Sequence, residues 1–275
     1  MTFLLQQLFP EGDFRFHLAL RRSAPANFFR RGDAAGRICA ERKRWLAADP
    51  ERYVALMPEG ETIVEEFGQF CHESGLITGM LPSALSSRER LFALGEMLET
   101  DVLFLSPDVD GTFRLRAGVL CFPTGWDLRE KLGHTLDWIH GIVPGLNAAL
   151  GSPIQNFLGR LKPGVAFLRD NWGIAATDAL NLHPSRNIAP PTSPVNLRQL
   201  WLRVENQALL ALPKSRGVVF GIKISLLRLD DLAMQSEMNA GLRRALETMP
   251  EEVVSYKRLS AIKRELIQRL AEYVE

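Results

Sequence analysis

The sequence predicts an α+β fold built on one antiparallel sheet, with a helical insert after the second strand and further helices at both ends. Two strand-like runs joined by an Asp-Gly turn come first, and three more follow a helical stretch. Helical patterns interrupted by proline precede and follow this set of strands. With 275 residues, of which 46% are hydrophobic, the chain can fill one large core.

The N-terminal region is locally basic. Residues 1–44 carry nine Lys and Arg against four Asp and Glu. We therefore divide the chain into a basic N-terminal arm, residues 1–40, and a single domain over residues 41–275. The cluster RRSAPANFFRRGDAAGR favours a solvated arm, and the alternative is a docking arm for a partner subunit.

Helical patterns then lead into a hairpin. They run from residue 40 to residue 70, with breaks at Pro50 and Pro58, and again over SSRERLFALGEMLETD. Ser87 is the expected N-cap of this second helix. The runs VLFLS and FRLRAGVLCF flank a PDVDG turn, which predicts a hairpin.

The second half of the chain supplies the helical insert, three more strands and the C-terminal helices. The insert covers roughly residues 127–160, and the strand-like runs after it are GVAFLRDNWGIA, LWLRVENQALLALP and GVVFGIKISLL. A proline-rich loop separates the first two runs, and the stretch from DLAMQSEMNAGLRRALETMP to the end is helical. Two strands, a helical insert and three strands is the element order of a PAS-like domain, whose core would span about residues 101–229.

Composition and motifs exclude several classes of protein. A net charge of +1 gives no reason to expect nucleic acid or a membrane as partner, and no apolar window is long enough to span a bilayer. The N-terminus has no secretory pattern, so we expect a cytoplasmic protein. Three scattered cysteines argue against a disulfide framework, a zinc ribbon or an iron–sulfur cluster. GxGxxG, P-loop and GxSxG motifs are absent, so a redox enzyme of this sequence would need electrons from another chain or domain.

The segment CFPTGWDLREKLGHTLDWIHGIVPG contains the best candidate ligand, His140. An amphipathic helix is expected here, ended by Pro144, with His140 on its apolar stripe. A histidine on a buried helix face is a possible haem or metal ligand, but is more often a satisfied core residue. His134 lies six positions earlier, about 240° around a regular helix, so the two cannot share one metal.

The last three strands carry polar side chains at every second position. These are Arg169 and Asn171 in the first, Arg203, Glu205 and Gln207 in the second, and Lys223 in the third. Because side chains alternate between the two faces of a strand, we expect the three strands to present these groups on one face. A solvated outer face is the commoner explanation. The alternative is a pocket wall on which donors and a carboxylate converge around a ligand.

Several separated motifs together resemble the haem-dependent oxidative N-demethylase alpha-subunit family. They are FRLRAGVLCFPTGWDLREKLGHTLDWIHGIVPG, LRDNWGI, LRVENQALLALP, GVVFGIKI and Tyr256-Lys257, and the resemblance runs from about Trp45 to Lys257. It implies a PAS-like domain that binds haem b and oxidises a small secondary alkylamine with O2. Separate reductase subunits, carrying FMN and an iron–sulfur centre, would deliver the electrons. One departure from the family pattern is Asn206, where a second arginine is usual.

The resemblance also implies roles for individual residues. His140 would be the axial haem ligand, with His134 as the second choice. Arg169 and Asn171 would donate to O2 or a haem propionate, Glu205 would hold the alkylammonium, Trp172 or Trp201 would add a cation–π face, and Arg203 and Lys223 would complete the cofactor pocket. A haem-binding sensor or carrier without turnover and a haem-free scaffold of the same fold are the alternatives.

Overall fold

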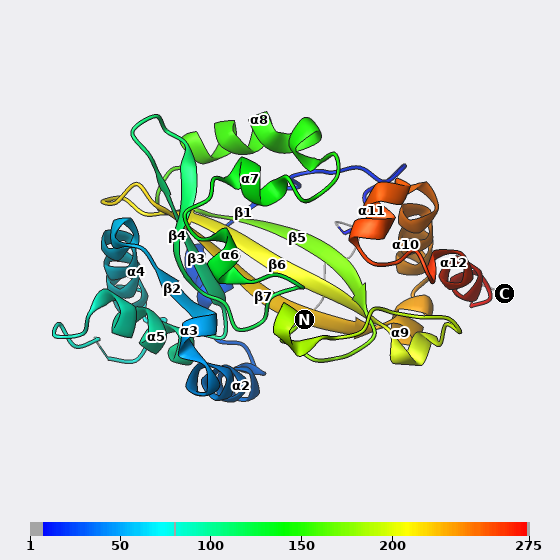
Figure 1. Cartoon of the computed structure of the whole chain (residues 1–275), viewed down its shortest axis with the longest axis horizontal. Helices are drawn as coiled ribbons and strands as arrows, with labels where there is room; N and C mark the ends of the chain where they lie inside the picture. Colours follow the sequence, from blue (N-terminus) through cyan, green and yellow to red (C-terminus); the bar gives the residue numbers. More distant parts are fainter. Residues whose placement is uncertain (1–7, 80, 274–275) are drawn as a thin grey trace.

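The computed structural model describes residues 8–79 and 81–273 and has a seven-stranded antiparallel sheet at its centre (Figure 1). The strand order is β1-β5-β6-β7-β3-β4-β2. The strands are β1 (Arg21–Ser23), β2 (Val54–Leu56), β3 (Asp101–Pro107), β4 (Phe113–Val119), β5 (Ala166–Ala175), β6 (Trp201–Ala211) and β7 (Val218–Arg228). This sheet and the helices around it confirm the expected α+β fold.

Helices cover both faces of the sheet (Figure 1). The N-terminal helices are α1 (Pro25–Phe29), α2 (Ala35–Ala48), α3 (Pro50–Tyr53), α4 (Glu61–Glu73) and α5 (Ser87–Met97). The insert consists of α6 (Leu128–Lys131), α7 (Leu136–His140) and α8 (Leu146–Gly159). The C-terminal helices are α9 (Leu229–Ala233), α10 (Ser236–Thr248), α11 (Glu251–Tyr256) and α12 (Lys263–Ala271). Short 3-10 turns lie at Pro58–Gly60, Pro184–Arg186 and Leu197–Gln199.

Three hydrophobic clusters hold these layers together, because each buries the apolar face of a helix against the sheet. The insert packs through Leu136 and Leu158 onto one face of the sheet, against strand residues that include Leu209 and Ile222. The N-terminal helices pack on the opposite face at one end of the sheet. The C-terminal helices pack on that opposite face at the other end, around Trp172 of β5.

The part of the predicted N-terminal arm that the structure describes is packed rather than solvated. Strand β1 pairs with β5, and Arg21 forms a 2.7 Å ion pair with Asp170. Phe28 and Phe29 are 7% and 0% exposed and join the core of the N-terminal helices. The basic residues led to the prediction of a solvated arm. Burial of the two phenylalanines, however, outweighs the preference of their charged neighbours for water.

The helical pattern over residues 40–70 hides one strand. Strand β2 lies between two short helical segments and pairs with β4, which makes it the edge of the sheet. Val54 and Ala55 are buried in this edge. A strand of three residues is too short for its alternation to be visible in the sequence, so the prediction of helix between Pro50 and Pro58 was wrong for this strand.

The stretch over residues 127–160 is helical but broken into three pieces. Gly133 and Gly145 adopt left-handed backbone angles, with φ of +81° and +74°, and they separate α6, α7 and α8. Helix α7 ends at His140 itself, four residues before Pro144. His134 precedes α7, so the two histidines do not lie on one regular helix, and the predicted 240° relation between them does not apply.

Candidate functional site

The segment that follows β4 is fixed by a buried carboxylate. Asp101 accepts hydrogen bonds from the backbone N–H groups of Cys121 (2.7 Å) and Phe122 (2.9 Å), and it also pairs with buried Arg42. Burial raises the pKa of the Cys121 thiol to about 12, so the thiol stays protonated at neutral pH. These contacts hold Phe122 and the following Thr124 against the sheet.

The pairing of β5 with β6 brings the predicted polar residues together. Arg169 lies opposite Gln207, Asn171 opposite Glu205, and Gly173 opposite Arg203. Paired residues in an antiparallel sheet share a face, and Leu209, two residues beyond Gln207, packs against the insert. We call the set on this face the polar face: Arg169, Asn171, Arg203, Glu205 and Gln207.

Glu205 is the only carboxylate of the polar face and is held by three donors. It accepts hydrogen bonds from Thr124 Oγ1 (2.6 Å), Gln207 Nε2 (2.9 Å) and, at longer range, Asn171 Nδ2 (3.4 Å). Donors on a loop and on two strands fix the direction of the carboxylate, which remains partly open to solvent. A fixed, half-exposed carboxylate is suited to binding a cationic group.

Arg203 donates its hydrogen bonds to Thr124 and to backbone carbonyls. Its Nε donates to Thr124 Oγ1 (2.9 Å), and its Nη2 donates to the carbonyls of Phe122 (2.9 Å) and Leu180 (2.7 Å). The side chain is 2% exposed, and burial lowers its pKa to about 10. Arg203 therefore ties two loops to the sheet, which leaves it little capacity for the predicted contact with a cofactor.

Arg169 differs from Arg203 in having no hydrogen-bond acceptor within the described part of the chain. Its Nε is buried, and none of the described residues accepts a hydrogen bond from it. Burial lowers the pKa of Arg169, and the negative charge of Glu205 opposes that change. A buried N–H without a partner is costly unless a ligand supplies an acceptor.

The positive charge of Arg169 acts on His140. Burial first, and then Arg169, lower the pKa of His140, while Asp137 acts in the opposite direction. The imidazole is therefore neutral at pH 7, and its ring has no hydrogen-bond partner among the described residues. Neutral imidazole is the form that binds a metal.

His134 has a different environment. Its ring stacks on that of Trp138, with the centroids 3.6 Å apart, and Trp138 is 48% exposed. The ammonium of Lys131 also lies 4.9 Å from the Trp138 ring. This stacked surface arrangement gives His134 a partner that His140 lacks.

The end of α11 adds two groups close to Glu205. Lys257 donates through Nζ to the carbonyl of Trp172 (2.6 Å), and burial lowers its pKa to about 8 against the opposing effect of Glu205. Burial and the charge of Glu205 also raise the pKa of Tyr256. The tertiary structure thus brings the C-terminal Tyr256-Lys257 pair to the carboxylate of β6.

Lys223 and Trp172 lie on the opposite face of the sheet. Lys223 pairs in register with Asn206, forms an ion pair with Glu99 and donates to the carbonyl of Arg30 (2.9 Å). The expectation that all three strands present polar groups on one face is therefore wrong for β7. On the side of the sheet that carries Glu205, β7 places Phe220, Ile222 and Ile224. Asn206 shares the far face, so this departure from the family pattern lies away from the polar face.

Trp172 is 7% exposed and belongs to the cluster under the C-terminal helices, where its ring meets that of Phe9 edge-on at 5.1 Å. Its cation–π partner is the ammonium of Lys257, 4.9 Å from the ring centroid. The aromatic face proposed for a substrate cation is therefore already occupied. Trp201 lies two residues before Arg203 on β6, so its side chain is on the same side of the sheet as the polar face, and it is half-buried.

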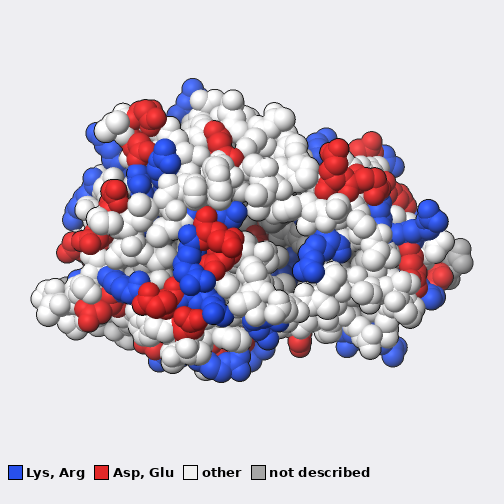
Figure 2. All heavy atoms as spheres, in the orientation of Figure 1, with Lys and Arg blue, Asp and Glu red and all other residues white. Residues whose placement is uncertain are grey.

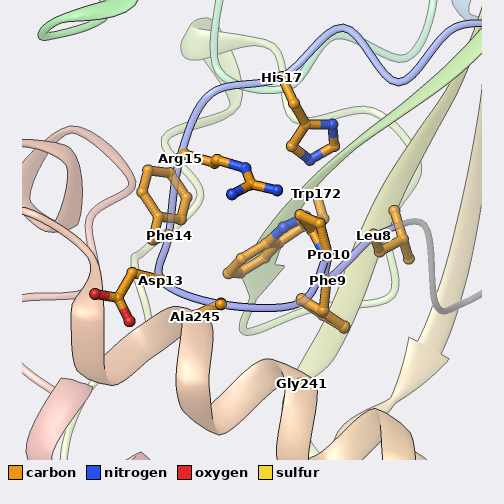
Figure 3. A pocket seen from close by; sticks show the side chains of 11 residues that line it. Leu8, Phe9, Pro10, Asp13, Phe14, Arg15, His17, Trp172, Gly241 and Ala245 are labelled. Atoms are coloured by element: carbon orange, nitrogen blue, oxygen red, sulfur yellow. The ribbon is translucent and has the colours of Figure 1, made fainter.

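The N-terminal segment contributes a histidine that sequence reasoning missed. Figure 3 shows this segment looping over Trp172, with the side chains of Arg15 and His17 turned inward. The segment is anchored on α10 by a bond from the Phe14 N–H to Thr248 Oγ1 (2.7 Å). Burial, then Arg169 and Arg15, lower the pKa of His17. No local pattern marks His17, because its position depends on the path of the whole segment; Thr124 was missed for the same reason.

The donor set fits a haem better than a metal ion bound by side chains alone. Among the described residues, no three His, Cys, Asp or Glu side chains come together as a metal site. A single neutral imidazole, His140, opposite a polar strand face is the usual protein contribution to a haem pocket. Figure 2 shows the surface hollowed between the insert and the C-terminal helices, above β5 and β6. The cavity under the N-terminal segment has a volume of about 30 Å³.

A family model described as haem-dependent oxidative N-demethylase, alpha subunit-like, matches residues 73–267, more than two thirds of the chain. The chain belongs to this N-demethylase alpha-subunit-like family. The match confirms the resemblance drawn from the motifs, and its description associates the chain with haem, oxidative N-demethylation and assembly with other subunits. Within the described residues, none of the helices is long and apolar enough to cross a membrane.

Proposed function

We propose that this protein is the haem-binding subunit of an O2-dependent oxidative N-demethylase acting on a small secondary alkylamine. Haem b would lie in the hollow between α7 and the polar face, inside a PAS-like core of about residues 101–229, with His140 as its axial ligand. The observation that carries the proposal is the environment of His140. Its ring is neutral, has no hydrogen-bond partner among the described residues and is influenced by the charge of Arg169 on the polar face.

The protein's own residues would bind and orient the amine. Glu205, fixed by Thr124, Asn171 and Gln207, would accept a hydrogen bond from the substrate ammonium. Lys257, with a pKa of about 8, would be positively charged at neutral pH and would lose that charge in the mildly alkaline range. A bound haem would supply the iron at which O2 is activated for oxidation of the N-methyl group.

The electrons would come from separate cytoplasmic reductase subunits carrying FMN and an iron–sulfur centre. Two observations support this part of the proposal. The family description names an alpha subunit, and the sequence has neither a nicotinamide fingerprint nor a cysteine cluster.

Reconstitution with haem tests the proposal. The wild-type protein and the His134→Ala variant are expected to give a Soret band and to shift it when dimethylamine is added. His140→Ala, which removes the axial nitrogen, is expected to lose the ligated spectrum while keeping its far-UV circular dichroism.

A Soret band that survives His140→Ala and disappears with His134→Ala would overturn the ligand assignment. Absence of any Soret band in the wild-type protein would favour a haem-free scaffold. A haem spectrum unaffected by amines, with no aldehyde formed in the presence of an artificial electron donor, would favour a sensor or carrier.

A further inference from the structure

Arg169 and Glu205 lie on the same face of two adjacent strands, β5 and β6, without pairing. The register makes them diagonal neighbours on adjacent strands, a relation in which Cα atoms are about 7–8 Å apart. Their charges act on each other, yet no ion pair within 4.0 Å joins them in the described part of the chain. Because the two charged groups are not paired with each other, each can contact a different end of a ligand that carries both signs.

No acidic side chain of the described structure satisfies the guanidinium of Arg169. The adjacent carboxylate, Asp170, points to the other face of β5 and pairs with Arg21 at 2.7 Å. Two histidines, His17 of the N-terminal segment and His140 of α7, lie within electrostatic reach of Arg169, and neither supplies a negative charge. The buried Nε of Arg169 therefore has no acceptor among the described residues, and the carboxylate of a ligand would supply one.

The charges that interact with Glu205 also bear on the kind of amine that the site would bind. Arg169 and Lys257 are positive, and Glu205 is the only negative group whose charge acts on both. A simple dialkylammonium ion would add another positive charge to this set, whereas a zwitterion would add none. A planar carboxylate is also the group that a guanidinium binds best, through two parallel N–H bonds.

We propose that the substrate is an N-methylated amino acid, with its ammonium on Glu205 and its carboxylate on Arg169. This rests on the proposed amine-oxidising function and narrows its substrate class from simple alkylamines to carboxylate-bearing ones. His17 of the N-terminal segment, which lies within electrostatic reach of Arg169, adds no competing anion.

Isothermal titration of the haem-reconstituted protein with N-methylglycine and with dimethylamine tests this assignment. N-methylglycine is expected to bind at least tenfold more tightly. Arg169→Met is expected to abolish the preference by weakening N-methylglycine alone, and Arg169→Lys, which keeps the charge, to retain part of it. Glu205→Gln is expected to weaken both ligands, and Lys162→Met, at an exposed position outside the site, to change neither.

Equal or tighter binding of dimethylamine would overturn the assignment while leaving amine oxidation intact. Loss of the Soret band in Arg169→Met, with the preference for N-methylglycine retained, would also overturn it, because the guanidinium would then hold a haem propionate. If the wild-type protein binds no haem, the proposed function fails, and titration of the haem-free protein still decides whether Arg169 binds the carboxylate.

Discussion

At the scale of single residues, the sequence could nominate side chains but could not say which would be free to act. His140, Arg169 and Glu205 were all chosen from alternation, helical position and family resemblance, and the pairing of β5 with β6 places the last two on one face. Arg203 follows the same alternation, yet backbone carbonyls take up its donors. Hydrogen-bond partners depend on loops distant in sequence, so local pattern cannot separate Arg203 from Arg169.

The pH dependence of haem binding follows from the lowered pKa of His140. An isolated histidine titrates near 6.5, and burial with the nearby charge of Arg169 moves His140 below that value. Because only the neutral ring binds iron, haem affinity is expected to stay constant from pH 8 down to pH 6.5. It should fall only as the pH drops further, through the lowered pKa.

Spectrophotometric haem titrations at a series of pH values measure this dependence. The His134→Ala variant should show the same midpoint and serves as the control. A midpoint at or above pH 6.5 would be inconsistent with the environment described for His140.

At the scale of elements, strands of seven or more residues were predictable and short or broken elements were not. Strands β5, β6 and β7 lie where their apolar and polar residues alternate, and β3 and β4 flank the expected turn. Strand β2 was missed because three residues show no period. The segment before Pro144 was predicted as one helix because its apolar stripe continues across Gly133, whose left-handed angle separates α6 from α7.

The N-terminus of α5 gives a test at this scale, since the predicted cap was one residue too late. Ser86, not Ser87, accepts the Glu89 N–H through Oγ (3.3 Å), and the Glu89 carboxylate accepts the Ser86 N–H (2.8 Å). Ser86→Ala is expected to lower the free energy of unfolding by about 1 kcal/mol.

Ser87→Ala is the matched control, and its effect should be no more than about 0.5 kcal/mol. Urea denaturation of the two variants measures the difference. A larger loss at Ser87 than at Ser86 would show that the sequence-based cap was correct.

At the scale of the whole molecule, the order of the elements predicted the α+β architecture. It did not predict the path that the two ends of the chain take across the fold. The N-terminal segment looked like a solvated arm, but it crosses the C-terminal helices, pairs with β5 and brings His17 towards Arg169. The C-terminal helices likewise return Lys257 to the neighbourhood of Glu205. The candidate site thus combines segments from both ends of the chain with the centre of the sheet, which no local pattern encodes.

The central claim is that haem binds in the hollow between α7 and the polar face. Anomalous diffraction at the iron absorption edge, from crystals of the haem-reconstituted protein, tests it most directly. One iron peak is expected at bonding distance from an imidazole nitrogen of His140, on the side of the sheet that carries Arg169 and Glu205. A peak beside His134, or on the opposite face of the sheet, would contradict it.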